Sequence, residues 1–415
     1  MKYNNIQQYR SYWQQINQKL IKQHFLWGWL YEMDEWHQYL ALDIYKMSRV
    51  HWNHIITATA DIAYLLQKIY FLIQNDIELF IQLGLPVSAY GLKKVKTPYF
   101  SYFSRMDLIV RDQDIKIIEI NCDTPLGFLE ASVCNRLICK EHGYDSPNQI
   151  ESAIQAAWQQ IKKDYAIPKT ETLYFTAYDW ADEDRETANF IKENCLFQPT
   201  EFIDIGDLVV TETGIFTPQG DKINWLYRLY PLEYLDDDID EAGNKIGQLF
   251  LQHIVQGNIK IINPPSALLM QSKAVLALIY ALFLEESEHL TETELQLIER
   301  YFLPTYFEAD YFKNNHQPYV IKPIWGREGE GITLVDAKGN IMQQDENDYY
   351  KNQKNIYQQY VKMPEFTIYT WNGEYSGQYV IGSFLINATP AGLFLRVGEA
   401  ITGNLSMFCP VTVVD

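Results

Sequence analysis

Three residues in the first third of the chain have the chemistry and the spacing of metal ligands. Asp107, Glu119 and Asn121 lie in the segment SRMDLIVRDQDIKIIEIN, residues 104–121, which predicts two strands. Side chains two residues apart in a strand share a face, so Asp107 points the same way as Arg105, and Glu119 the same way as Asn121. Two carboxylates and an amide oxygen are hard ligands of the kind that Mg²⁺ takes from a protein, with phosphates completing its octahedron.

The loop between the two predicted strands determines whether these side chains meet. A three-residue loop, residues 112–114, would place Asp107 opposite Glu119 and Arg105 opposite Asn121. Directly opposed like charges destabilise a hairpin by up to about 1 kcal/mol, and a divalent cation between them reverses that sign. The alternative is an ordinary surface hairpin with scattered charges, and a one-residue slip of register would separate the pair.

A lysine and a glycine-rich loop in the last third of the chain could hold an anion. Lys322 lies in an apolar predicted strand, 319–323, which is followed by the loop GREGEG, 326–331, and a second predicted strand, 332–335. Glycines let backbone N–H groups approach an anion closely, and the lysine supplies a point charge. The loop lacks GK[ST] and joins strand to strand, so it is not a Walker A loop. An ordinary β-turn is the alternative.

A second lysine, Lys354, precedes another predicted strand, residues 356–361. Lysine, glycine loop, lysine and strand follow one another in ATP-grasp proteins, which clamp a nucleotide with them. In such an arrangement the adenine would lie along the backbone of Gln359, Tyr360 and Val361.

One arginine stands in an otherwise apolar predicted strand. Arg396 lies within FLRV, residues 394–397. An arginine is costly to bury unless it meets an anion, so the pattern predicts either a phosphate contact or a structural salt bridge.

Both helices and strands must position these residues. Residues 9–85 predict helices with many aromatic side chains, and apolar residues at helical spacing over 55–83 predict one long helix. Short strands alternate with helices over 172–210, as in a small α/β unit. Strands and glycine turns dominate from Tyr319 onward. The chain therefore predicts an α+β or α/β fold of several layers with a β-rich C-terminal part.

The net charge of the chain argues against some classes of binding partner. A formal net charge of −19 argues against nucleic acid and against anionic membranes, because both need a basic surface. The longest apolar run, Ala274 to Leu284, is too short to span a bilayer, and the first ten residues lack the apolar core of a signal peptide. The five cysteines form no paired framework, so we expect a reduced, cytoplasmic protein.

Five motifs in order resemble the glutathionylspermidine synthetase family of ATP-grasp ligases, over nearly the whole chain. They are RMD (105–107), EINCDTP (119–125) with Glu130, KPIWGREG (322–329), QKNIYQQ (353–359) and GLFLRVGEAIT (392–402). Weaker similarities are YRLYPLE (227–233) and INPPSALLMQSKA (262–274). The metal carboxylates precede the nucleotide lysines, which is the order of this family rather than of most ATP-grasp enzymes.

The resemblance implies an ATP-grasp fold with an N-terminal helical pre-ATP-grasp region. It divides the chain into a helical region with the metal-binding hairpin, 1–165, a small α/β unit on the substrate side, 166–270, and a nucleotide-clamping region, 271–415.

The resemblance also implies roles for single residues at the nucleotide end. Two Mg²⁺ ions would be held by three ligands, Asp107, Glu119 and Asn121, with Glu119 bridging them. Arg105 would contact phosphate, and Arg396 would stabilise the transferring γ-phosphoryl group and the acyl phosphate. The remaining nucleotide contacts would come from Lys322, Gly326, Gly329, Lys354, Gln359, Tyr360 and Val361.

On the substrate side the resemblance is weaker. Thr124 and Glu233 match residues that contact the peptide-like carboxylate substrate. Leu126, Ala267 and Arg228 depart from the family pattern, in which two hydroxyls and a lysine are usual at these positions. Neither glutathione nor spermidine is therefore identified as a substrate.

The function implied is an ATP- and Mg²⁺-dependent ligase that joins a small carboxylate, peptide-like molecule to an amine. ATP would convert the carboxylate to an acyl phosphate, which the amine then attacks. The altered substrate-side positions also allow an ATP-binding module without ligase activity, and a phosphotransferase or hydrolase without an amine acceptor is a third possibility.

Overall fold

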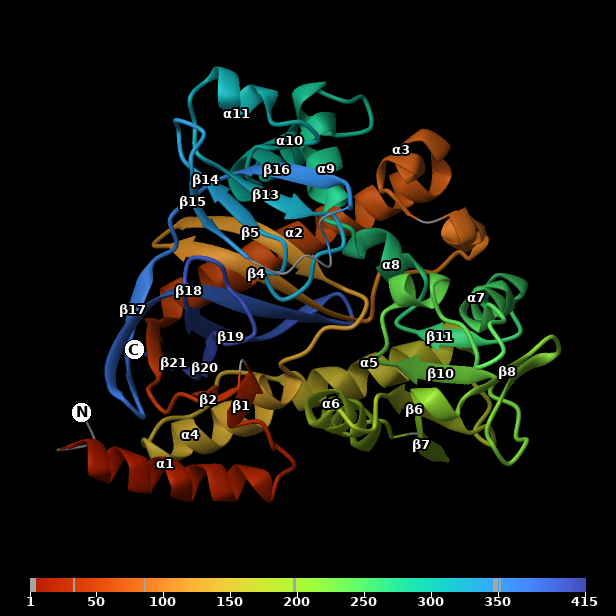
Figure 1. The fold of residues 1–415 in the computed structure, drawn as a ribbon, viewed down its shortest axis with the longest axis horizontal. Helices are drawn as coiled ribbons and strands as arrows, with labels where there is room; N and C mark the ends of the chain where they lie inside the picture. The colour runs from red at the N-terminus through yellow and green to blue at the C-terminus, as the bar shows by residue number, and fades with distance from the viewer. Residues whose placement is uncertain (1–4, 33, 86, 197–198, 346–349, 351) are drawn as a thin grey trace.

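The computed structural model describes residues 5–32, 34–85, 87–196, 199–345, 350 and 352–415. Within them, helices surround three larger sheets, and three pairs of short strands complete the structure (Figure 1). The predicted mixture of helices and strands, with a β-rich C-terminal part, is confirmed.

The largest sheet is antiparallel and joins segments far apart in the sequence. Its order is β20-β19-β18-β4-β5, with β17 also paired to β18. The strands are β4 (Phe103–Arg111), β5 (Asp114–Asn121), β17 (Glu365–Thr370), β18 (Gly373–Ile386), β19 (Thr389–Gly398) and β20 (Met407–Cys409). The predicted metal hairpin, β4–β5, is therefore in one sheet with β19, the strand of Arg396.

A second antiparallel sheet carries Lys322, which is predicted to bind the nucleotide, and lies above the first in Figure 1. Its order is β12-β16-β13-β14-β15. The strands are β12 (Thr305–Tyr306), β13 (Tyr319–Pro323), β14 (Thr333–Val335), β15 (Ile341–Gln344) and β16 (Asn355–Gln359), with helices α9 (Ala274–Leu284), α10 (Glu292–Tyr301) and α11 (Asp310–Asn314) beside them. Lys322 pairs with Ile356 across β13 and β16, so the two predicted strands are neighbours.

The third sheet is parallel, with the order β11-β10-β6-β7. It confirms the predicted small α/β unit, because parallel strands need crossover connections such as helices. Its elements are α5 (Ile150–Tyr165), β6 (Leu173–Ala177), α6 (Asp182–Glu193), β7 (Thr200–Asp204), β10 (Trp225–Arg228), α7 (Ile246–Gln256) and β11 (Lys260–Ile262). At the end of the predicted range 172–210, a short 3₁₀ turn, η3 (Ile205–Asp207), separates β7 from β8 (Val209–Thr211).

The prediction of helices alone over residues 9–85 is wrong. Three short strands lie between α1 (Ile6–Ile21) and the long helix α2 (Arg49–Asn75). They are β1 (Trp29–Glu32), β2 (Glu35–Gln38) and β3 (Tyr45–Ser48). The first two form a hairpin, and β3 pairs with β21 (Val411–Val414) near the C-terminus, a long-range partner that no local pattern predicts.

The single helix predicted over 55–83 is two helices. The Ser48 side chain caps α2 by accepting from the His51 N–H, and Asp76 ends that helix and caps α3 (Ile77–Gln82). An Asp side chain satisfies the free N–H groups of a new helix start, which explains the break. The remaining elements are η1 (Val87–Lys94), the π-helical turn η2 (Glu130–Cys134), α4 (Asn135–Glu141), β9 (Gly214–Phe216), η4 (Leu232–Asp236) and α8 (Ser266–Gln271).

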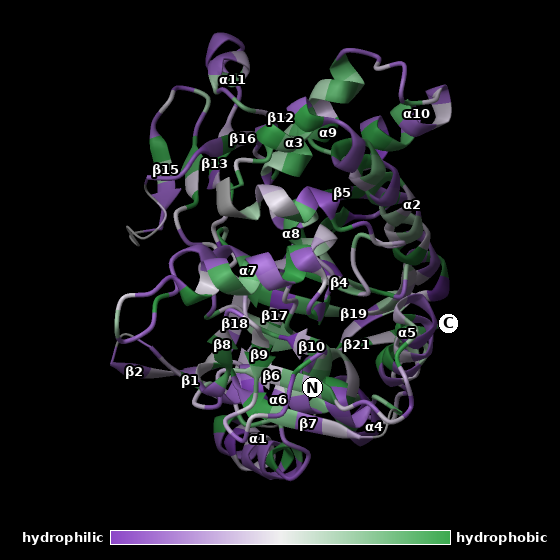
Figure 2. Ribbon diagram, turned by 90° about the vertical axis from the view of Figure 1, so that its right-hand side faces the viewer, coloured by the Kyte–Doolittle hydropathy of each residue, from purple (hydrophilic) through white to green (hydrophobic). Residues whose placement is uncertain are grey.

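Two large hydrophobic clusters fill the interior. One gathers the buried faces of α2, α8 and α9 with the strands of the largest sheet, and the other lies among α1, α5 and the parallel sheet. Figure 2 shows α9 as hydrophobic and the β1–β2 hairpin as hydrophilic. By length and composition α2 could cross a membrane. This is weak evidence for a membrane span, because half of the most apolar window of the helix is buried in the fold, as in a core helix.

Candidate active site

The β4–β5 hairpin, which is predicted to bind metal, pairs the residues that the sequence predicts, although its turn is shorter than predicted and β5 contains a bulge. Asp107 pairs with Glu119, and Arg105 with Asn121. The predicted three-residue loop is wrong, because Arg111 already pairs with Asp114. A bulge on β5 adds one residue and restores the register next to the site.

The extra residue of the bulge is Ile118, which lies between the paired residues Ile117 and Glu119. Its carbonyl oxygen accepts a hydrogen bond of 2.9 Å from Lys322 Nζ. The bulge therefore turns Glu119 to the face of Asp107 and also ties β5 to the lysine strand of the second sheet.

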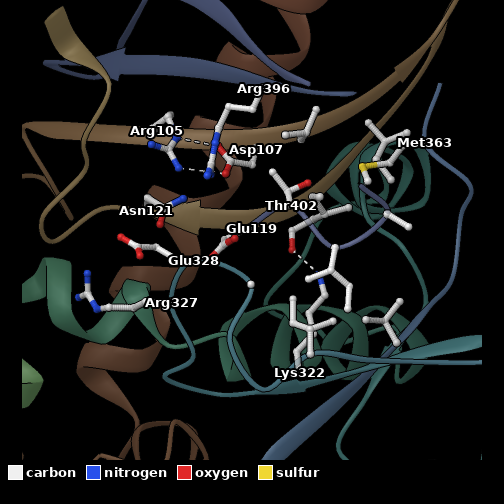
Figure 3. A pocket seen from close by; sticks show the side chains of 18 of the residues that line it. Arg105, Asp107, Glu119, Asn121, Lys322, Arg327, Glu328, Met363, Arg396 and Thr402 are labelled. Atoms are coloured by element: carbon white, nitrogen blue, oxygen red, sulfur yellow. Dashed lines mark hydrogen bonds and ion pairs between the residues drawn. The ribbon is translucent and has the colours of Figure 1, made fainter. Parts of the chain in front are cut away.

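One pocket between the two antiparallel sheets collects most of the predicted residues (Figure 3). Those that line it are Arg105, Asp107, Glu119, Asn121, Thr124, Lys322, Gly329, Gln359, Tyr360, Val361 and Arg396. They come from β4, β5, β13, β16 and β19 and from the loops that follow them.

Three predicted residues are not among the described residues that line this pocket. Lys354 is exposed, and its Cδ lies close to Gly84. Gly326 shapes its loop, since a Cβ there would come within 2.9 Å of the Glu330 carbonyl oxygen. Glu233 reaches the pocket through Arg327, as shown below.

Arg105 and Asp107 form a two-pronged ion pair. Arg105 Nε donates to Asp107 Oδ1 at 2.7 Å and Nη2 donates to Oδ2 at 3.0 Å, while Nη1 donates to the Leu126 carbonyl at 2.9 Å. Burial alone would lower the pKa of Arg105, but Asp107 raises it, so this charge is permanent. Figure 3 shows Arg396 reaching toward the same carboxylate from β19, where its Nη2 donates to the Gly403 carbonyl at 2.7 Å.

A buried lysine that was not predicted as a site residue holds the second carboxylate. Lys273 Nζ donates to Glu119 Oε1 at 2.7 Å and to the Gly326 carbonyl. Burial would raise the pKa of Glu119, yet Lys273, then Lys322 and Arg105, lower it. The available signal was a charged residue directly before the most apolar run of the chain, where burial requires a partner.

Lys322 is a buried charge of the pocket. Its Nζ donates to the Ile118 carbonyl and, at 2.7 Å, to Gln358 Oε1. An ammonium has three donors, so one N–H remains for another acceptor. Burial lowers the pKa of Lys322 to about 8, although Glu119 opposes that shift.

The hairpin side chains fit a divalent cation by donor type and position. Asp107, Glu119 and Asn121 all line the pocket, and each carries a side-chain oxygen. Both carboxylates are held by cationic side chains, and the described residues contain no group of three His, Cys, Asp or Glu side chains arranged for a metal. Binding of Mg²⁺ would therefore compete with Arg105 and Lys273.

The two predicted substrate residues meet at one arginine of the glycine loop, Arg327. Its Nε and Nη2 both donate to Glu233 Oε1, the former at 3.0 Å, and its Nη1 donates to Thr124 Oγ1 at 3.1 Å. Arg327 was part of a quoted motif but was not predicted as a site residue.

Two of the three departures from the family pattern lie away from the pocket. Arg228 is 1% exposed and forms a two-pronged ion pair with Asp123, with one distance of 2.9 Å. Ala267 is fully buried beneath Cys122, whose thiol donates to the Ala267 carbonyl. Neither is among the described residues that line the pocket, whereas Leu126 is.

Carboxyl groups form a further part of the wall. Glu183, in the first turn of α6, lines the pocket with Glu328 and Tyr39. The Tyr39 hydroxyl donates at 2.9 Å to Glu130, which is fully buried in the π-helical turn. Burial raises the pKa of Glu130 and of Glu183, and repulsion by neighbouring carboxylates adds to the latter shift. In the sequence Glu183 is one of several acidic residues expected on a helix surface, so it was not predicted as a site residue.

Apolar side chains line the side of the pocket that is remote from Arg327 in Figure 3. Ile109, Met363 and Val380 form a small buried cluster against which Ile118 and Val361 pack. A flat apolar ring would fit this end, whereas charged groups would fit the other.

Comparisons with known proteins identify the family of this chain. The family model described as glutathionylspermidine synthase preATP-grasp matches residues 6–414. A Haemophilus influenzae protein named "Putative acid--amine ligase" is 26% identical over 330 residues, which cover 75% of this chain and 74% of that protein.

A solved structure shows the same fold. The glutathione synthetase-like effector from Globodera pallida, in its apo form, superposes with a TM-score of 0.62 over 99% of this chain and 98% of its own, at 10% identity. Because the family model covers almost the whole chain, the protein belongs to the glutathionylspermidine synthase preATP-grasp family.

Proposed function

We propose that this protein is an ATP- and Mg²⁺-dependent ligase that forms an amide between a small carboxylate and an amine through an acyl phosphate. The carrying observation is the single pocket in which Asp107, Glu119 and Asn121 face Lys322 and Arg396. Oxygen ligands for a cation beside fixed positive charges are what phosphoryl transfer requires. The chain is an ATP-dependent C–N ligase by its family and by the name of its Haemophilus relative.

An ATP-grasp arrangement is the finer proposal for the nucleotide. The adenine would lie in the apolar end of the pocket, along Gln359, Tyr360 and Val361. The N–H groups of Gln359 and Tyr360 donate to the carbonyls of Pro304 and Pro318. The Val361 N–H has no hydrogen bond in the part of the chain that the structure describes, so it is the donor available to a ring nitrogen.

The phosphates would lie at the charged end. Lys322 retains one donor, and Arg105 and Arg396 add two permanent charges near Asp107. The two Mg²⁺ ions, held by Asp107, Glu119 and Asn121, would neutralise charge on the phosphate oxygens. The chain's own role there is positioning, because its charged groups are fixed by hydrogen bonds before substrate arrives.

The proposed reaction has two steps. A carboxylate oxygen bonds to the γ-phosphorus as the bond to the bridging oxygen breaks, which gives an acyl phosphate and ADP. The amine nitrogen bonds to the acyl carbon as the bond from that carbon to the phosphate oxygen breaks, and the departing phosphate takes up the proton that the amine loses. Arg396 stabilises the charge of the transferring group, and the glycine loop, residues 326–331, excludes water from the intermediate.

Hydroxylamine trapping tests this proposal. With ATP, Mg²⁺ and a panel of small peptides, the protein should release ADP and form a hydroxamate only when an acid is present. Arg396→Met should abolish both signals, whereas Arg300→Met, at an arginine outside the pocket lining, should leave them unchanged. Bound ATP without ADP release for every acid–amine pair would instead favour a binding module, and ADP release without hydroxamate would favour a hydrolase.

A further inference from the structure

We propose that Arg327 recognises the carboxylate of the acid substrate and that Glu233 positions Arg327 for this task. The inference rests on the proposed function, because the ligase reaction needs a bound carboxylate. It assigns substrate contact to a loop residue and gives Glu233, expected near the substrate, an indirect role.

The guanidinium of Arg327 is fixed on three sides. Glu233 Oε1 accepts from two of its nitrogens, and Thr124 Oγ1 accepts from the third. The ring of Tyr234 lies under it, with the guanidinium carbon 5.6 Å from the ring centroid. A planar group held in this way loses little further freedom when it binds a ligand.

Arg327 still has donors to offer. A guanidinium carries five N–H groups, and the described contacts use three of them. The side chain is 22% exposed and lines the pocket, whereas Glu233 is 7% exposed. Two N–H groups of Arg327 therefore remain without a described acceptor, and a carboxylate is the acceptor that fits two N–H groups at once.

Charges of both signs surround Arg327, since Glu233 pairs with it and Glu183 and Glu328 also line the pocket, so an anion would be bound here by the free N–H groups of Arg327 rather than by a net positive charge. The pKa of Arg327 would fall through burial, but Glu233 raises it, so the guanidinium stays charged. The nearby acid Asp123 is already neutralised by Arg228. Glu233 accepts from Arg327 through one oxygen only. This contact fixes the guanidinium and leaves some of the N–H groups of the guanidinium unused.

The position of Arg327 links the acid to the phosphoryl end of the pocket. In the same loop Gly329 has φ +81° and packs so closely on Thr402 that a Cβ would come within 2.9 Å of the Thr402 carbonyl. The next residue, Gly403, holds Arg396. The glycine loop thus connects Arg327 to the segment that holds Arg396, which lies across the pocket (Figure 3).

The test measures binding of a carboxylate directly. Isothermal titration calorimetry with ADP and Mg²⁺ present compares tripeptides that have a free C-terminal carboxylate with their C-terminal amides. We expect the tightest acid to bind the wild type about 10- to 100-fold more tightly than its amide, as for a charged hydrogen bond. Arg327→Met should remove that difference, and Arg327→Lys should restore part of it.

The matched control is Arg300→Met, because Arg300 also stacks on a tyrosine, Tyr301, at 5.2 Å but lies outside the pocket lining. It should keep the acid–amide difference. Glu233→Gln should weaken acid binding less than Arg327→Met, as expected of a positioning residue. An acid–amide difference that survives in Arg327→Met, or no such difference for any peptide with the wild type, would overturn the inference.

Turnover separates this inference from the proposed function. Arg327→Met should raise the KM of the acid while the KM of ATP stays the same, whereas a mere loop anchor would change the KM of ATP. Asp107→Asn should lose ADP release but keep the acid–amide difference. If the wild type releases no ADP while that difference still depends on Arg327, the ligase proposal fails and the role of Arg327 stands.

Discussion

Asp107 and Glu119 lie directly opposite each other because two local irregularities of their hairpin cancel. The turn after Arg111 is one residue shorter than the spacing predicts, and the bulge at Ile118 adds one residue to β5. Either feature alone would turn Glu119 to the opposite face of the sheet, because side chains alternate along a strand. The facing carboxylates are therefore a specified feature of the fold, and they give the first prediction.

Asp107→Asn should reduce ADP release by at least about 100-fold, since it removes the negative charge of a proposed cation ligand and weakens the hold on Arg105. Steady-state ADP release over a range of Mg²⁺ concentrations measures the effect. The matched control is Asp114→Asn on the same hairpin, an exposed acid paired with Arg111, which should leave the rate unchanged. Equal rates for Asp107→Asn and the wild type would exclude the metal site.

The three lysines should differ in their effect on nucleotide binding. Lys322→Met and Lys273→Met each remove a buried charge from the phosphate end, so the KM of ATP should rise by about 10- to 100-fold. Lys354→Met should change it by less than about twofold, because the side chain is exposed and lies outside the pocket lining. A Lys354 effect as large as that of Lys322 would restore the role implied by the sequence motif.

Arg228 should matter for stability rather than for substrate binding. Arg228→Met leaves Asp123 charged and fully buried, which should cost about 3–5 kcal/mol of unfolding free energy. Urea unfolding measures this loss, and Arg228→Lys should retain part of the stability with no change in the KM of either substrate. For comparison, Arg111→Met removes an exposed pair and should cost less than about 1 kcal/mol.

Glu294 should make stability depend on pH. Burial would raise its pKa, but Lys68, then the Thr291 N–H and the Tyr64 hydroxyl, lower it to about 2. A carboxyl whose pKa is lower in the folded state stabilises the fold above its unfolded pKa of about 4.3, and this contribution disappears as the pH falls toward about 2.

Glu294→Gln should therefore cost about 1–2 kcal/mol at neutral pH and much less at pH values near the folded pKa. Chemical unfolding of both proteins at several pH values measures the difference. Glu292→Gln, at an exposed acid in the same helix turn, is the control and should show no such trend. A constant difference between Glu294→Gln and the wild type at all pH values would contradict the prediction.

The sequence by itself determined the local parts of the site. Period-two alternation placed Asp107 with Arg105 and Glu119 with Asn121, and the structure confirms both the strands and their pairing. The motif order identified the family, and the family model confirms it. The strand faces are local, because the alternation of side chains depends on neighbouring residues only, whereas the family was identified from motifs spread along the chain.

The tertiary structure decided which charges meet, since ion pairs join residues far apart in the chain. Lys273 reaches Glu119 from a helix start, and Arg327 joins Thr124 to Glu233. No spacing in the sequence encodes these distances, because they depend on how two separate sheets and a loop pack together. For the same reason the sequence placed Arg228 on the substrate side, although the side chain is buried in the core in an ion pair with Asp123.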